Sequence, residues 1–196
     1  MCFRNPAVNA FLLSFCATIL LILTTFSTPF VSPFYFLHSS VDGGVRFGGW
    51  GWCMDSGACS SRGLGYHWES QIDHSLTYPL VFYPIAGFAV LATLSLLPIL
   101  CSRSVRIYPF PAFSLLSLLA AITSFLAFLF SIILFGVAST RFHHGGYKAS
   151  LGPANWMSLV AMCLWFILSL NSGCGTMCRG AFGGGGPYVT YVYPYY

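Results

Sequence analysis

Charged residues are scarce in this sequence. Of its 196 residues, 8 are Lys or Arg and 4 are Asp or Glu, so that 6% of the chain is charged while 57% is hydrophobic. A soluble globular domain typically has about 25% charged residues. The composition therefore predicts a membrane protein rather than a soluble one, and we expect no nucleic-acid partner.

Four stretches of more than twenty-five residues contain no Asp, Glu, Lys or Arg. Each holds roughly the 20 apolar residues that a helix, rising about 1.5 Å per residue, needs to cross about 30 Å of hydrocarbon. The sequence therefore predicts an all-α transmembrane fold with four spans, at about residues 10–31, 79–101, 112–139 and 154–171. The second span contains Pro84 and Pro98, which we expect to form kinks whose freed carbonyls find partners in a bundle.

Positive charge does not decide the orientation of these helices. Lys and Arg are divided four to four between the two sides, so the positive-inside rule is tied. Cys53 and Cys59 break the tie, because a disulfide between them requires an oxidising compartment. We therefore place the loop of residues 32–78 and the loop after the third span outside, and both termini in the cytosol. All four acidic residues then lie outside, namely Asp42, Asp55, Glu69 and Asp73.

An alternative is that the first apolar run, which follows Arg4, is a cleaved signal peptide. Three spans would then remain, with the same loop outside. The apolar stretch from Phe11 to Val31 is longer than the usual signal core of about 7–15 residues. This length favours a retained helix, and a tag at the N-terminus would separate the two possibilities.

The first outer loop contains a glycine-rich stretch, FGGWGWCMDSGACSSRGLGYHW, at residues 47–68. Cys53 and Cys59 can close a tight loop there, and such a disulfide removes roughly 2 kcal/mol of unfolded-state entropy. Zinc binding by these cysteines together with His67 and His74 is an alternative that an oxidising compartment disfavours. Aromatic residues that alternate with small ones are compatible with short strands. The loop therefore predicts a small extracellular sheet.

This stretch resembles the first outer loop of the PalI-type family of fungal four-span membrane proteins, where F-G-x-x-G-x-C, a second cysteine and L-G-Y follow the first helix. The matching positions are Phe47, Gly48, Trp50, Gly51, Cys53, Cys59, Leu64, Gly65 and Tyr66. The wider resemblance is to the claudin-like superfamily, although the cysteine spacing here is shorter than the usual claudin one. The start of the fourth span also resembles the PalI-type pattern, at Gly152, Ala154 and Trp156.

The resemblance implies a left-handed, four-helix claudin-like bundle topped by a small extracellular β-sheet from the first outer loop, to which the second outer loop could add a strand. Residues 1–172 would form this domain in the plasma membrane, and residues 173–196 a short Gly/Tyr-rich cytosolic tail. Small residues recur at three- and four-residue spacing in the third span and independently predict close helix packing. They are Ser114, Ser117, Ala121, Ser124, Ala127 and Ser131.

The sequence offers no recognisable catalytic site. The four predicted spans lack Asp, Glu, Lys and Arg, which are the usual residues of intramembrane proton relays and charge-selective pores. The chain has no nucleophile elbow, phosphate-binding loop or zinc-protease helix. We therefore expect no enzymatic activity, no bound metal and no cofactor, and we keep a channel or transporter subunit only as a third hypothesis.

All five histidines lie in or beside the predicted outer loops, at His38, His67, His74, His143 and His144. Histidine ordinarily titrates near pH 6.5, so these residues are candidates for a pH-responsive outer face. Exclusion of polar residues from the spans would give the same distribution. On the cytosolic side, Cys174 and Cys178 follow the fourth span directly. They are candidates for reversible palmitoylation, with two inert reduced thiols as the alternative.

PalI-type proteins are implicated in ambient-pH signalling, and the resemblance therefore implies an accessory subunit of a plasma-membrane pH sensor. The tail is shorter than the long hydrophilic tails of the pH-response members. This difference favours a second hypothesis, an organiser of cortical membrane domains or cell contacts in an eisosome-like or claudin-like role. The expected partners are membrane lipids, with a multi-span sensor or cortical scaffold proteins, and a homo-oligomer is compatible with both hypotheses.

Overall fold

A computed structural model describes residues 6–63, 66, 68, 72, 77–85, 87–97, 106–107, 111–181 and 190–191. Three long helices dominate the fold: α1 (Pro6–Thr25), α6 (Pro111–His144) and α7 (Pro153–Ala181). Within this described part of the chain, three segments are long and apolar enough to cross a membrane, namely Val8–Thr25, Ala112–His144 and Pro153–Ser172. They agree with the first, third and fourth predicted spans, although α1 ends before residue 31 and α6 continues past residue 139.

The predicted second span is interrupted. In place of one helix over residues 79–101, the structure has the 3-10 turn η3 (Tyr78–Val81), α3 (Phe82–Ile85) and α4 (Phe88–Leu94). The part of this span that the structure describes is therefore helical in short pieces, and residues 86 and 98–101 lie outside the described residues. Pro84 in α3 has no N–H for a helical hydrogen bond. Beside the interruption, the Thr25 hydroxyl donates to the carbonyl of Tyr83 at 3.3 Å.

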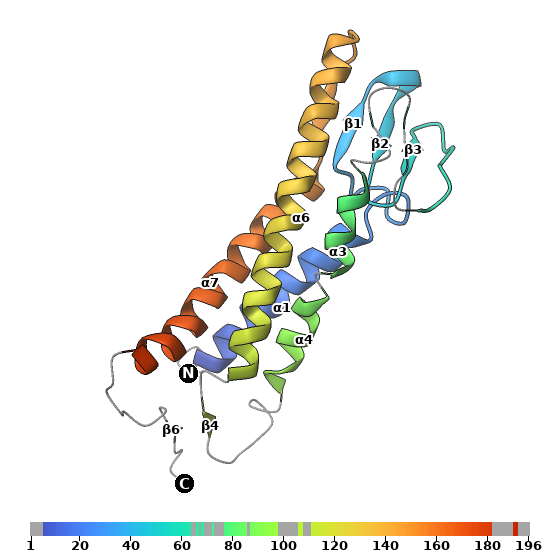
Figure 1. Ribbon diagram of the computed structural model, residues 1–196. Helices are drawn as coiled ribbons and strands as arrows, with labels where there is room; N and C mark the ends of the chain where they lie inside the picture. The colour runs from blue at the N-terminus through green and yellow to red at the C-terminus, as the bar shows by residue number, and fades with distance from the viewer. Residues whose placement is uncertain are drawn as a thin grey trace.

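The interrupted segment nevertheless packs in the bundle. Figure 1 shows α3 and α4 running alongside α1 and α6, and both α1 and α6 contact α7. The first turn of α1 and the last turn of α7 lie at the end of the bundle opposite the four-stranded sheet. The chain therefore forms a helical bundle of three long helices and one broken segment, with a sheet at one end.

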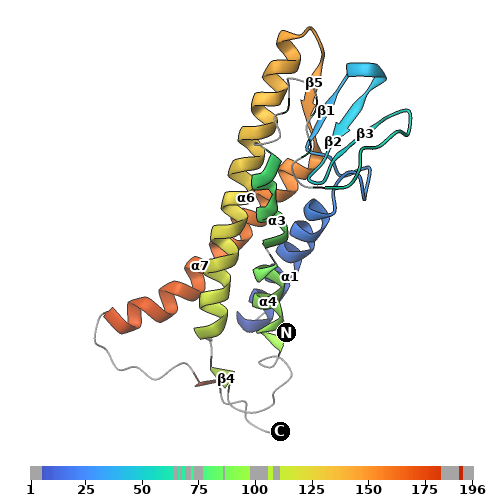
Figure 2. The same ribbon diagram turned by 45° about the vertical axis from the view of Figure 1, so that its right-hand side comes forward.

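Four short strands form an antiparallel sheet in the order β3-β2-β1-β5 (Figure 2). The strands are β1 (Leu37–Ser39), β2 (Val45–Phe47), β3 (Trp52–Met54) and β5 (Ala149–Leu151). Leu37 lies opposite Phe47 on one side and Leu151 on the other. The first loop thus supplies three strands and the loop between α6 and α7 adds the fourth. A second, two-stranded sheet pairs β4 (Arg106–Ile107) with β6 (Thr190–Tyr191).

The turn between β1 and β2 is formed by η2 (Val41–Gly43). Three successive residues there, Asp42, Gly43 and Gly44, have positive φ angles of 47°, 89° and 120°. Glycine adopts such angles without steric cost, which explains why the tightest part of this connection is Gly-Gly. In both β1 and β2 the first and third residues are buried and the middle one is not, so the turn leaves the same face of both strands against the core.

The buried apolar residues form two clusters. The sheet-side core lies between the sheet and the adjoining half of α6, and its bulkiest members are aromatic: Phe36, Phe47, Trp68, Tyr83, Phe135 and Phe142. The bundle core lies between the helices farther from the sheet and is rich in alanine: Ala10, Ala17, Ala89, Ala92, Ala120, Ala121 and Ala161, with Phe113 and Trp165. Five of the six small residues predicted to pack in the third span are buried, namely Ser117, Ala121, Ser124, Ala127 and Ser131.

Candidate functional site

The candidate site is the sheet end, where the residues of the family-like motif meet. Cys53 and Cys59 form a disulfide with Cα atoms 4.0 Å apart, which is the pairing expected from the sequence. The closed loop is also held by the Met54 amide, which donates to the Ala58 carbonyl at 2.7 Å. Gly57 turns the loop with a φ of 100°. The disulfide therefore closes a rigid hairpin extension of β3.

Glycines of the motif allow close backbone approach. A Cβ atom on Gly48 would collide with the carbonyl of Thr28, and a Cβ on Gly51 would collide with the hydroxyl of Ser60. The Gly48 amide donates to the Gly51 carbonyl at 2.8 Å. Gly48 therefore lets the loop lie against the backbone of the segment that follows α1, and Gly51 gives room to the Ser60 side chain of the same loop.

Trp50 and Tyr66 fasten the same loop by hydrogen bonds to the main chain. The Trp50 indole N–H donates to the Thr25 carbonyl at the end of α1, at 2.7 Å. The Tyr66 hydroxyl donates to the Gly48 carbonyl, also at 2.7 Å. Burial raises the pKa of the Tyr66 phenol, which keeps its proton and remains a donor. Leu64 and Gly65, the other motif positions, lie outside the described residues.

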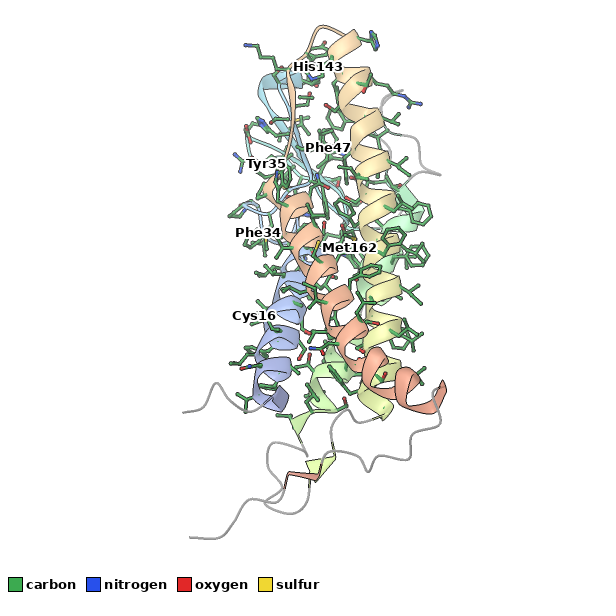
Figure 3. All side chains as sticks on the ribbon, turned by 90° about the vertical axis from the view of Figure 1, so that its left-hand side faces the viewer. Cys16, Phe34, Tyr35, Phe47, His143 and Met162 are labelled. Carbon is green, nitrogen blue, oxygen red and sulfur yellow. A yellow bond between two sulfur atoms is a disulfide. The ribbon has the colours of Figure 1, made fainter. Side chains whose placement is uncertain are left out.

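Phe47 is the apolar anchor of the motif. Its side chain is buried, with its ring centroid 5.7 Å from that of Trp68 and 5.7 Å from that of Phe142 on α6. Trp52 packs edge-on against Trp68 at 4.4 Å. The aromatic residues of the opening motif thus attach the sheet to α6, and Phe47 lies between the sheet and that helix in Figure 3.

The second loop is locked to the first through the start of α7. The Asn155 side-chain amide donates to the Phe36 carbonyl at 2.7 Å, and its oxygen accepts from Ser131 on α6 at 2.9 Å. A Cβ on Gly152 would collide with the main chain and ring of Tyr35. Gly152 and the buried Ala154 therefore have packing roles, whereas Trp156, 64% exposed, points outward. The sequence did not predict the bridging role of Asn155. Its position between the motif residues Ala154 and Trp156 was the signal that could have indicated it.

A charged cluster occupies the exposed face of the sheet. Asp55, in the disulfide loop, accepts from Arg46 Nε at 2.9 Å, and its other oxygen lies 3.2 Å from His38 Nε2. The side chains of His38, Asp55 and Arg46 are 34%, 33% and 37% exposed. The Arg46 guanidinium also lies 5.6 Å from the ring centre of Tyr35. We call His38, Arg46 and Asp55 the surface triad.

The strand register brings the surface triad together. His38 lies directly opposite Arg46, and both residues alternate with buried neighbours. On its other side His38 faces Ser150 of β5, which does not titrate. The partnership with Asp55 was missed from the sequence, because it depends on how the disulfide loop folds back over the sheet.

The other candidate histidines are not gathered at this site. His143 and His144 are exposed in the last turn of α6 (Figure 3), where a cationic side chain is favoured by the helix dipole. His67 and His74 lie outside the described residues. Within the described part of the chain, no three His, Cys, Asp or Glu side chains lie close enough together to hold a metal ion.

The two candidate palmitoylation cysteines lie at the end of the bundle opposite the four-stranded sheet. Cys174 and Cys178 lie in the last turns of α7, which extends to Ala181 and therefore beyond the predicted end of the fourth span. Two other cysteines have free, exposed thiols, Cys16 on α1 and Cys163 on α7. The sequence reasoning did not single out either of them.

Comparison with known proteins places this architecture in a family. The model of the SUR7/PalI family matches residues 7–170. The chain belongs to the SUR7/PalI family. The match runs from the start of α1 almost to Asn171, and it includes both loops that build the sheet. No curated protein matched the chain. As a member of the SUR7/PalI family, the protein is a membrane protein, and the resemblance inferred from the loop motif is confirmed.

Proposed function

We propose that this SUR7/PalI protein is a non-catalytic accessory subunit of a plasma-membrane ambient-pH sensor. In this proposal the sheet faces the outside and both termini lie in the cytosol. The disulfide supports that orientation, because a Cys53–Cys59 bond persists in an oxidising compartment. The start of α1 and the end of α7 lie at the end of the bundle opposite the four-stranded sheet, which is compatible with this orientation.

The surface triad is the observation that carries the proposal. Histidine is the side chain whose charge ordinarily changes between pH 5 and pH 8. When His38 carries a proton, it and Arg46 would share Asp55 and hold the disulfide loop against β1. When His38 carries no proton, the only charged partner of Asp55 in the surface triad is Arg46. External pH would therefore change how firmly the disulfide loop is attached, on a face accessible to a partner.

Proximity labelling tests this proposal in cells that produce the protein. The tagged full-length chain is compared at acidic and alkaline external pH, and the recovery of multi-span membrane proteins is quantified. We expect recovery of a sensor whose yield depends on pH. The variant His38→Gln should bring the acid-to-alkaline ratio of this yield close to one. His143→Gln, at the exposed end of α6, is the matched control and should keep the ratio of the unmodified protein.

Two outcomes would overturn the proposal. If cortical coat and lipid-domain proteins are recovered equally at both pH values, and deletion leaves growth in alkaline medium normal, the protein is an organiser of membrane domains. If a sensor is recovered but His38→Gln and His143→Gln behave alike, the surface triad is not the pH-responsive element.

A further inference from the structure

A cavity of about 410 Å³ lies between α1 and the interrupted segment. Its walls are apolar side chains of the last two turns of α1 and of α4, including Leu21, Ile22, Ala89 and Val90. Phe30 and Trp50 line its sheet-side end. Its volume falls within the range of about 300–1,000 Å³ that is typical of small-molecule sites.

The cavity lies beside Gly87, the residue before α4. Gly87, which lines it, lies between α3 and α4 and has no side chain to fill the space. The only hydroxyl groups of the α1 wall are already bonded. Thr18 Oγ1 lies 2.9 Å from Thr93 Oγ1, and Thr25 Oγ1 donates to the Leu21 carbonyl at 2.7 Å. The walls therefore offer an occupant hydrocarbon contact and no free hydroxyl from these two threonines.

The cavity opens at the exposed outer face of the bundle, which would meet lipid in a membrane. Ile22, Phe26 and Phe30 line it and are each between 42% and 49% exposed. These residues belong to the sheet-side end of α1 and the turn after it. A lipid acyl chain in the cavity would therefore come from the membrane leaflet nearest the sheet.

A positive charge lies near the sheet-side end of the cavity. The Arg62 guanidinium lies 4.9 Å from the centre of the Phe30 ring, and Phe30 in turn packs edge-on against Trp50 at 6.1 Å. Arg46 is neutralised by Asp55, whereas Arg62 has no acidic partner within salt-bridge distance among the described residues. At its sheet-side end, the apolar cavity thus has a guanidinium nearby that forms no ion pair with the described acidic residues.

We propose that this cavity binds one acyl chain of an anionic glycerophospholipid, with the lipid phosphate at Arg62. The apolar walls would bind the acyl chain by hydrocarbon contact, and the planar guanidinium provides hydrogen-bond donors that match a phosphate. Charge complementarity favours this occupant, because neither a sterol nor an apolar helix of another protein would offer an anion to the Arg62 guanidinium. The inference does not depend on the proposed role in pH sensing.

Photocrosslinking of the purified full-length protein in phosphatidylcholine nanodiscs tests the site. The probe is phosphatidylserine with a diazirine on one acyl chain, and the same label on phosphatidylcholine is the comparison. We expect crosslinks on the peptides that contain Ile22 and Val90. One favourable cation near the membrane surface corresponds to a preference of about fivefold for phosphatidylserine.

Matched variants separate the chain site from the headgroup site. Ile22→Trp fills the cavity and should remove most labelling of both peptides, whereas Ile19→Trp changes an equally exposed residue of α1 outside the cavity and should leave it unchanged. Arg62→Gln should keep labelling but bring the preference for phosphatidylserine close to one. Lys148→Gln removes the same charge from another exposed position at the sheet end and should keep the preference.

The proposal fails if label is spread evenly around α1, or if Ile22→Trp and Ile19→Trp behave alike. It also fails if Arg62→Gln retains the preference for phosphatidylserine, or if a sterol competes with the probe and phosphatidylserine does not. Because these measurements use purified protein at one pH, their failure leaves the test of the pH-sensing proposal unaffected.

Discussion

The two cores of this protein are built from different side chains. The sheet-side core buries large aromatic rings, with Phe36 and Phe135 stacked at 5.1 Å. The bundle core buries alanines and hydroxyl residues, with Thr18 of α1 bonded to Thr93 of α4. Beside water, burial of large apolar surface drives packing. Within lipid that driving force is absent between helices, and close approach of small residues and hydrogen bonds replace it.

The largest expected effect is in the sheet-side core. Phe47→Ala should destabilise the protein by about 3–5 kcal/mol, because it leaves a cavity between the sheet, Trp68 and Phe142. Denaturant titration in micelles would measure the loss in free energy of unfolding. Phe125→Ala is the control, since Phe125 is 41% exposed on α6 and its removal opens no enclosed cavity. Equal losses for the two variants would contradict the distinction between the cores.

A smaller effect is expected from the disulfide of the same region. Removing both cysteines with Cys53→Ser and Cys59→Ser should cost about 2 kcal/mol, the chain-entropy value for so short a loop. We expect both the single and the double variants to reach the cell surface in reduced amount. The double variant Cys16→Ser and Cys163→Ser, which removes two free thiols on helices, is the control. Normal surface delivery without the disulfide would show that the sheet is held by its aromatic core alone.

The difference between the regions also explains what could be predicted from the sequence. Long charge-free runs predict α1, α6 and α7, because their signal is local composition. The motif around Cys53 and Cys59 predicts the sheet and the disulfide. The interruption beside Gly87 was not predicted, since Pro84 is compatible with a mere kink and the break depends on how α4 packs against α1.

Long-range partnerships escaped prediction for the same reason. Asp55 reaches His38 across 17 positions of the chain, and Asn155 reaches the Phe36 carbonyl across 119. Neither pair leaves a pattern in the local sequence. In both cases only the folded sheet and the start of α7 bring the polar groups within hydrogen-bonding distance.

The smallest predicted effect tests the polar ties of the bundle core. Thr18→Val keeps the shape of the side chain but removes its hydrogen bonds to Thr93 and to the Ala89 carbonyl of α4. Hydrogen bonds between membrane helices contribute on average about 0.6 kcal/mol, so the loss in unfolding free energy should be of that order. Thr123→Val is the matched control, because the Thr123 hydroxyl donates to carbonyls of its own helix, those of Leu119 and Ala120. Only Thr18→Val should weaken the packing of α4 against α1, and faster hydrogen exchange of the α4 amides would show it. If both threonine variants leave α4 equally protected, small-residue packing rather than hydrogen bonding holds the broken segment against α1.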